Sequence, residues 1–203
     1  GFVANGLGVF GMVLALRMME EFCLTIDEVD VLTGPLLGRA KSATFRTADL
    51  TGLDVLSHVA AGLATATGED FALPQWVATM VKAGQLGEKS GAGFYKKVGK
   101  EIQTLNWKTM AYAPAAKPAS PAIDKALKLP LGDRLRAAVA LEGAYGKFAR
   151  EYLTRLSRYV VDTAPKIAYH LSDVDHAMEW GFAWEAGPFK QLRDLSGRYV
   201  VDM

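Results

Sequence analysis

The chain has 203 residues, of which 50% are hydrophobic and 22% are charged, and its formal net charge at pH 7 is +1. This length is enough for one large domain or two small ones with a buried core. The near-neutral balance excludes an overall field that would draw the chain to nucleic acid or to an acidic membrane.

No stretch approaches the roughly 18 apolar residues of a membrane span, and no basic segment precedes an apolar one as in a signal peptide. The single cysteine, Cys23, excludes an internal disulfide and predicts a cytoplasmic protein. Because Cys23 follows an apolar helical stretch, we expect a buried packing residue rather than a reactive thiol. The abrupt start at Gly1 and the lack of a stop signal at Met203 suggest a piece of a longer protein.

Four helices are expected in the first half of the chain. Apolar residues at helical spacing predict the first, the capping-box pattern Thr25–Glu28 opens the second, and Gly34-Pro35 ends it. Asp49 is the expected N-cap of the third helix, and Pro74 marks the start of the fourth. The expected bounds are residues 7–23, 25–32, 49–66 and 74–84.

The helical pattern then gives way to a strand pattern. Residues 94–98 and 101–107 flank Gly99-Lys100 and predict a β-hairpin. The Ala/Pro-rich segment 112–121 is typical of a semi-rigid linker. Helices are expected beyond it over residues 123–128, 131–162, 172–179 and 188–195. The sequence therefore predicts an all-α chain with a small β-hairpin between two helical units.

One pattern occurs twice at a spacing of 145 residues. Val29-Asp30 and Asp49-Leu50-Thr51-Gly52 in the first half correspond to Val174-Asp175 and Asp194-Leu195-Ser196-Gly197 in the second. The two explanations are chance and a divergent duplication of one supersecondary unit, and we favour the duplication. The predicted organisation is a first unit over residues 1–111, a linker over 112–121, and a second unit over 122–203.

The segment Gly6-Leu7-Gly8-Val9-Phe10-Gly11 fits the G-x-G-x-x-G pattern of dinucleotide-binding loops. That pattern is meaningful only after a β-strand, and five residues leave little room for one. We therefore favour a glycine-tolerant helix start over a cofactor site.

The other polar candidates favour structural roles. The histidines His58, His170 and His176 show no metal-ligand spacing, and a packed or surface position is expected for each. The acidic pairs Glu20-Glu21 and Asp173–Asp175 fit solvated helix ends. The aromatic segment 180–184 predicts a plug packed on the long helix, with a ligand-facing wall as the alternative.

Asn5 is the one polar side chain in the apolar segment Gly1–Asn5. An asparagine just before an apolar helix is most simply an N-cap. Its amide could instead hold a substrate oxygen, since it both donates and accepts hydrogen bonds.

Four segments together resemble the C-terminal domain of 3-hydroxyacyl-CoA dehydrogenases. They are Gly1–Asn5, the acidic helix Ile26–Asp30, the F-x-x-x-D-x-x-G-L-D signature Phe45–Asp54 and the closing Gly87–Tyr95. The resemblance covers residues 1 to about 97. In the second half, Asp175–Phe182 and Gly187–Phe189 are similar to the second copy of this domain in long multi-domain members.

The resemblance implies a fold like the C-terminal domain of 6-phosphogluconate dehydrogenase. It also implies an NAD-dependent parent enzyme of fatty-acid β-oxidation, in which a missing N-terminal Rossmann domain binds NAD and supplies a catalytic His-Glu pair. The helical region would wall the acyl-CoA site and form a dimer or pseudo-dimer interface. An enoyl-CoA hydratase-like domain can accompany it. Asn5 would contact the 3-oxygen of the substrate.

One departure from the family pattern is Gly6, where the family usually has arginine, and it puts the active-site edge in doubt. The fragment alone is expected to be inactive. Two alternatives remain open: a purely structural or interaction module, and the helical domain of another β-hydroxyacid-type NAD dehydrogenase. The signature at Phe45–Asp54 argues against the latter.

Overall fold

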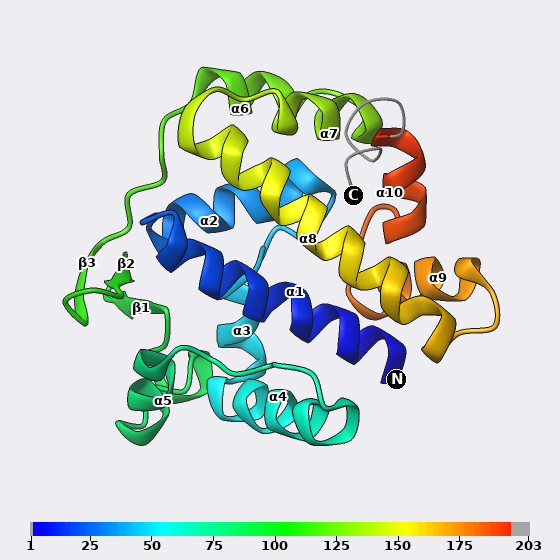
Figure 1. Ribbon diagram of the computed structural model, residues 1–203. Coiled ribbons are helices and arrows are strands. Elements are labelled where there is room, and N and C mark those ends of the chain that lie inside the picture. The colour runs from blue at the N-terminus through cyan, green and yellow to red at the C-terminus, as the bar shows by residue number, and fades with distance from the viewer. Residues whose placement is uncertain (1, 196–203) are drawn as a thin grey trace. The chain divides into compact units, whose positions relative to one another are not determined.

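The computed structural model describes residues 2–195 (Figure 1). Ser196 and Gly197 of the repeated pattern lie outside the described residues. The chain divides into two compact units. The sheet unit contains residues 12–31 and 42–118, and the α8 unit contains residues 2–11, 32–41 and 119–195 of the described chain.

The described part of the chain is mainly helical with one small antiparallel sheet, which confirms the predicted fold class. The α-helices are α1 (Phe2–Glu21), α2 (Ile26–Thr33), α3 (Phe45–Thr51), α4 (Leu53–Thr67), α5 (Gln75–Lys82), α6 (Pro121–Ala126), α7 (Leu131–Val139), α8 (Gly143–Ile167), α9 (Leu171–Gly181) and α10 (Pro188–Leu195). The 3-10 helices are η1 (Pro35–Leu37) and η2 (Glu88–Ser90), and the strands are β1 (Tyr95–Val98), β2 (Glu101–Asn106) and β3 (Ala111–Pro114).

Helix α2 begins at the predicted capping box. The Thr25 N–H donates to the Glu28 carboxylate at 2.7 Å, and the Glu28 N–H donates to Thr25 Oγ1 at 3.2 Å. These reciprocal bonds satisfy two N–H groups that a helix start otherwise leaves unpaired. The box therefore fixes where α2 starts.

The sheet has the order β1-β2-β3, with the predicted hairpin turning at Gly99-Lys100. Its third strand overlaps the start of the predicted linker, residues 112–121, and pairs with β2 over Gln103–Asn106. Phe94, just before β1, is buried and packs edge-on against Phe45 of α3 at 4.8 Å between ring centroids. This aromatic contact joins the sheet to the helices of the same unit.

The prediction of one third helix capped by Asp49 is wrong. Two helices, α3 and α4, meet at Gly52, whose φ of +102° is open to glycine and strained for other residues. Asp49 lies inside α3, where its side chain is 1% exposed. Its carboxylate binds the start of β1 instead of a helix end.

The prediction of one long helix over residues 131–162 is also wrong, because α7 and α8 are separate helices. Gly143 has a φ of +66°, and a Cβ on Gly146 would lie 1.6 Å from the Leu141 carbonyl oxygen. These two glycines allow the chain to reverse between α7 and α8, which follow one another in Figure 1. Helix α10 has the predicted bounds, and α9 is longer at both ends than expected.

Cys23 is exposed, which corrects the expectation of a buried thiol. Helix α1 ends at Glu21, earlier than predicted, and Cys23 adopts a left-handed φ of +52°. The Leu24 N–H donates to the Met19 carbonyl at 3.0 Å, as in a Schellman-type helix end. The turn directs the thiol to the surface.

Helix α1 also corrects the expectation about membrane spans. By length and composition alone, Val3–Glu21 is long and apolar enough to cross a membrane. Of its most apolar window, 67% is buried in the fold, as in the core helix of a globular protein. This burial explains why the helix is apolar around its whole circumference.

Candidate functional site

Asn5 lies on the second turn of α1, and its side chain is exposed. Because α1 begins at Phe2, Asn5 is inside the helix and is not its N-cap. The apolar residues before Asn5 fit the helical pattern, so the helix starts before Asn5. The amide of Asn5 is therefore not used at the helix end and faces outward.

The three glycines of the apparent nucleotide motif lie within α1 and not in a loop after a strand. A Cβ on Gly8 would lie 2.0 Å from the ring of Phe182, and the Tyr152 hydroxyl donates to the Gly11 carbonyl at 3.2 Å. Glycine at these two positions allows aromatic side chains of the α8 unit to approach the helix backbone. The motif is thus a packing feature of α1 and has no phosphate-binding geometry.

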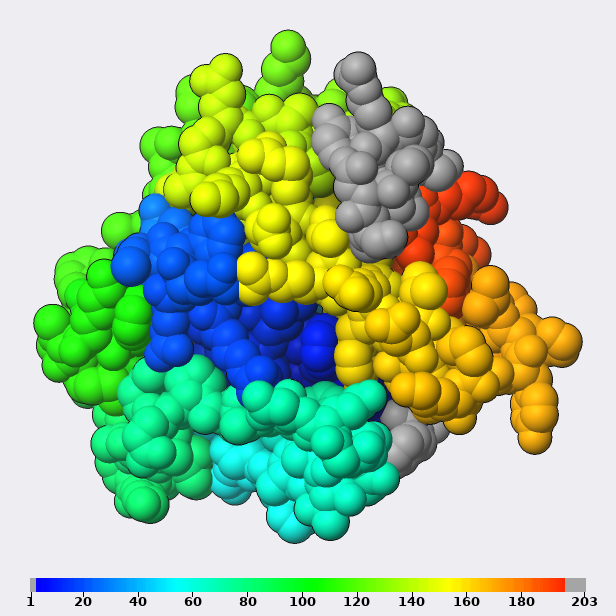
Figure 2. All heavy atoms as spheres, in the orientation of Figure 1, coloured from blue at the N-terminus to red at the C-terminus, as the bar shows by residue number. Residues whose placement is uncertain are grey.

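The aromatic segment 180–184 divides into packed and exposed rings. Trp184 is 8% exposed, whereas Trp180 is 81% exposed and stacks on His176 at 4.8 Å between centroids. Trp180 projects from the side of α9 opposite to its buried residues Val174 and Met178. In the space-filling view the orange segment that includes α9 lies at the surface of the face shown (Figure 2). Trp184 is thus buried, as the predicted plug requires, whereas Trp180 is not.

The most densely bonded carboxylate of the sheet unit is Asp30, which belongs to the repeated pattern and to the acidic helix segment but was not expected to be a site residue. Asp30 accepts N–H groups from the start of α3, at 3.0 Å from Thr44, 2.7 Å from Phe45 and 3.2 Å from Arg46. The Tyr95 hydroxyl also donates to it at 2.7 Å. Burial raises the pKa of Asp30 to about 7, although these hydrogen bonds act against the shift.

Asp49 is bound to the start of β1. The N–H groups of Phe94 and Tyr95 donate to its carboxylate at 2.9 and 2.8 Å. Burial raises the pKa of Asp49 to about 6, and the two backbone donors lower it. Gly93 has no room for a side chain, since a Cβ there would lie 2.1 Å from the Asp49 carboxylate. Asp30, Asp49 and Tyr95 thus form one polar cluster that joins α2, α3 and the sheet, with Asp49 buried and Asp30 and Tyr95 half-buried.

Asp175 repeats part of this arrangement in the α8 unit. It accepts the Phe189 N–H at 2.8 Å at the start of α10, as Asp30 accepts from the start of α3. The helix that carries Asp175 also begins like α2, because the His170 N–H donates to the Asp173 carboxylate at 3.1 Å. His170 and Asp173 follow Thr25 and Glu28 by the same 145 residues.

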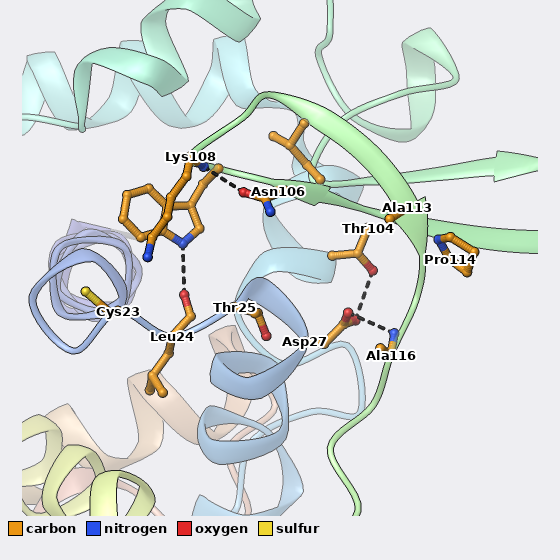
Figure 3. Close-up of a pocket in the computed structure, with 12 residues that line it drawn as sticks. Cys23, Leu24, Thr25, Asp27, Thr104, Asn106, Lys108, Ala113, Pro114 and Ala116 are labelled. Carbon is orange, nitrogen blue, oxygen red and sulfur yellow. Dashed lines mark hydrogen bonds between the residues drawn. The ribbon is translucent and has the colours of Figure 1, made fainter.

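A pocket of about 250 Å³ opens in the sheet unit between β2 and the start of α2 (Figure 3). Its polar groups bind one another: Thr104 donates to Asp27 at 3.0 Å, and Trp107 donates to the Leu24 carbonyl at 2.8 Å. The Ala116 N–H also donates to Asp27 at 3.1 Å. These bonds join the sheet to α2, so the polar groups that line the pocket have a structural role.

The histidines lie at or near the surface, with His58 and His170 exposed and His176 half-buried under Trp180. Of the acidic pairs, Glu20 accepts the Trp76 indole N–H at 2.7 Å and Asp175 binds the start of α10. Within residues 2–195, no three His, Cys, Asp or Glu side chains gather as a metal site would need. The residues that sequence analysis singled out thus do not converge on one constellation around Asn5.

Residues 1–97 match the family described as "3-hydroxyacyl-CoA dehydrogenase, C-terminal domain". These residues are therefore similar to that domain family. The match includes Asn5 and the cluster of Asp30, Asp49 and Tyr95. The cluster thus lies within the matched segment, where it holds the start of β1.

Curated relatives extend the similarity beyond this half. A "Probable 3-hydroxyacyl-CoA dehydrogenase" of Bacillus subtilis is 37% identical over 195 residues, covering 93% of this chain and 25% of that protein. A protein of the same name from Deinococcus radiodurans is 59% identical over 103 residues, covering 50% of this chain and 30% of that protein. The chain therefore spans about a quarter to a third of the length of these relatives.

A solved structure shows the same fold over almost the whole chain. It is described as 3-hydroxybutyryl-CoA dehydrogenase from Escherichia coli K12 and gives a TM-score of 0.60 at 18% identity. The similarity covers 96% of this chain and 53% of that one. At this identity the likeness supports the helical fold alone.

Proposed function

We propose that this chain is the helical C-terminal part of an NAD-dependent (S)-3-hydroxyacyl-CoA dehydrogenase of fatty-acid β-oxidation. The family match over residues 1–97 carries the proposal, and the Bacillus subtilis relative supports it over nearly the whole chain. The full-length enzyme would be cytoplasmic and would oxidise the 3-hydroxyl of an acyl-CoA to a ketone. NAD would be bound by an N-terminal domain that also carries the catalytic His-Glu pair.

In this proposal Asn5 binds the 3-oxygen of the substrate. Its exposed amide lies near the start of α1, where Gly6 adds no side chain that would cover it. An amide N–H that donates to the 3-oxygen would orient the hydroxyl group for reaction. The fragment alone would be inactive, because the helical glycines of α1 cannot cradle a dinucleotide.

The test is Asn5→Ala in the full-length dehydrogenase, assayed by NADH formation on a 3-hydroxyacyl-CoA. We expect kcat/KM to fall roughly tenfold or more, about 1.4 kcal/mol of transition-state stabilisation, with an unchanged melting temperature. The matched control is Gln75→Ala, which removes an exposed amide at the start of α5. Unchanged turnover of Asn5→Ala would refute the role of Asn5, and a full-length protein that forms no NADH would refute the proposed activity.

A second candidate function is an interaction module in which the two halves form a pseudo-dimer within one chain. The corresponding contacts of Asp30 and Asp175, each at the start of the next helix, favour a duplicated helical unit. On this view the second copy would cover a face of the first copy that could otherwise pair with a second chain. Size-exclusion chromatography with light scattering separates the alternatives: a monomer supports an internal pseudo-dimer, and a dimer contradicts it.

A further inference from the structure

The hairpin of β1 and β2 is packed at one end and free at the other. At the packed end Phe94, Thr104 and Leu105 are buried. At the other end every residue over Lys96–Ile102 is exposed, and this segment includes the turn at Gly99-Lys100. We refer to Lys96–Ile102 as the hairpin end. The hairpin end therefore adds little to the core of the sheet unit.

Apolar side chains are exposed on both faces of the hairpin end. Ile102 lies opposite Lys97 in the strand pair and shares its face. Val98 follows Lys97 and lies on the other face, because successive side chains of a strand alternate between faces. Val98 is 46% exposed and Ile102 is 45% exposed. A flat protein surface can cover one face of a strand pair, whereas a fluid medium can surround both.

Four exposed lysines lie on the hairpin end or follow its neighbouring strand. They are Lys96, Lys97, Lys100 and Lys117. The last of them comes shortly after Ala115, whose N–H donates to the Ile102 carbonyl at 2.9 Å. In the part of the chain that the structure describes, none of these four ammonium groups forms an ion pair. Their charges therefore remain available to an anionic partner.

This positive charge is local to the sheet. Residues 95–117 contain five lysines and one acidic residue, Glu101, although the net charge of the whole chain is only +1. The rest of the chain therefore carries more acidic than basic residues. Because salt screens exposed charges beyond about 10 Å at 0.1 M, a nearby anionic surface would interact with the sheet segment rather than with the average charge of the chain.

We propose that the hairpin end docks on an anionic lipid membrane. Val98 and Ile102 enter the boundary between headgroups and acyl chains, and the four lysines lie against the charged lipid headgroups. Lysine suits this boundary because its apolar stem can lie beside lipid while its ammonium group stays in water. The two exposed apolar faces favour a membrane over an acidic protein, which would cover one face. This association is peripheral and goes beyond the proposed dehydrogenase function.

The test is co-sedimentation of the 203-residue chain with vesicles of phosphatidylcholine, with and without phosphatidylglycerol. We expect binding to the anionic vesicles alone, and weaker binding as sodium chloride is added. Replacement of the four lysines by glutamine should weaken binding roughly a hundredfold or more, because each lysine contributes about fivefold near an anionic membrane. The matched control replaces four exposed lysines of the α8 unit by glutamine and should bind like the wild type. These are Lys125, Lys128, Lys147 and Lys166.

The apolar contribution is tested separately. The double variant Val98→Ser/Ile102→Ser keeps every lysine and should weaken binding roughly tenfold or more, because less apolar area leaves water. Both side chains are largely exposed, so the variant should keep its fold, and circular dichroism checks this.

A fluorescent label reports whether each face of the hairpin end enters the lipid. Cys23 is the single cysteine, so Cys23→Ser gives a background in which Val98→Cys or Ile102→Cys carries one environment-sensitive dye. The emission of both labels should shift to shorter wavelength on addition of anionic vesicles. The control label at Thr109→Cys lies in the exposed turn between β2 and β3, at the other end of β2, and should not shift.

Three results would overturn the proposal. The first is a lack of binding to anionic vesicles, or equal binding by the wild type and the variant that lacks the four lysines. The second is an emission shift at only one of the two labelled positions, or binding that the serine variant leaves unchanged. The third is equally tight binding to soluble polyglutamate, which would assign the surface to an acidic protein. None of these measurements depends on dehydrogenase activity, so their failure is distinguishable from failure of the proposed function.

Discussion

Replacement of Asp30 by alanine should lower the free energy of unfolding more than replacement of its counterpart Asp175 by alanine. Asp30 accepts three N–H groups at the start of α3 and the hydroxyl of Tyr95. Asp175 accepts the Phe189 N–H at the start of α10, and burial raises its pKa as well. The two positions therefore test one kind of contact with different numbers of hydrogen-bond donors.

The expected cost follows from the groups that lose their partner. Loss of a helix cap destabilises a protein by about 1 kcal/mol. A buried hydroxyl left without a partner costs about 1–3 kcal/mol, so Asp30→Ala should cost roughly 3 kcal/mol. Asp175→Ala should cost about 1 kcal/mol, because it removes a cap alone.

Urea denaturation of the 203-residue chain, followed by circular dichroism and tryptophan fluorescence, measures both costs. Two probes are needed, because two compact units can unfold in separate transitions. Tyr95→Phe isolates the hydroxyl and should cost about 1 kcal/mol. Equal costs for Asp30→Ala and Asp175→Ala, or a cost below about 0.5 kcal/mol for Asp30→Ala, would refute the reasoning.

Two further predictions concern pH and glycine packing. Because burial raises the pKa of Asp30 from 3.8 to about 7, the folded chain binds more protons, and its unfolding free energy should fall as pH rises from 3.8 to about 7. Asp30→Asn should flatten this profile, and an unchanged slope would contradict the assignment. Gly8→Ala should cost about 1–3 kcal/mol because of the Phe182 ring, whereas Gly6→Ala, with open space around its Cβ, should stabilise by about 0.5–1 kcal/mol. Equal melting temperatures for the two glycine variants would contradict the packing.

Local sequence signals predicted the elements whose ends depend on nearby residues. The Thr25–Glu28 box set the start of α2, Pro188 opened α10, and Gly99-Lys100 formed the hairpin turn. In each case the deciding hydrogen bonds or backbone angles involve residues a few positions apart. Such local signals do not depend on the tertiary packing around them.

Signals that depend on distant residues were misread. Asp49 resembled an N-cap, but its partners Phe94 and Tyr95 are 45 and 46 residues away. β3 escaped notice because an Ala/Pro-rich sequence has weak strand propensity, and its pairing with β2 decides its structure.

The candidate site was less predictable than the fold. Asn5 entered through a family resemblance, and the structure changes its local description from a cap to an exposed helical side chain. Its proposed role depends on groups outside the chain, because the described residues place no base or cofactor loop beside it. A sequence can identify a family residue by its motif, but the chemistry of that residue needs the complete site.

The proposed duplication explains which contacts the second copy keeps. Asp175 retains the bond to the next helix, which holds two consecutive helices together without any sheet. Asp49 holds the start of β1 in the first copy, whereas its counterpart Asp194 is 34% exposed and lies 3.8 Å from Arg193. The contact that the two proposed copies share is therefore the one between consecutive helices.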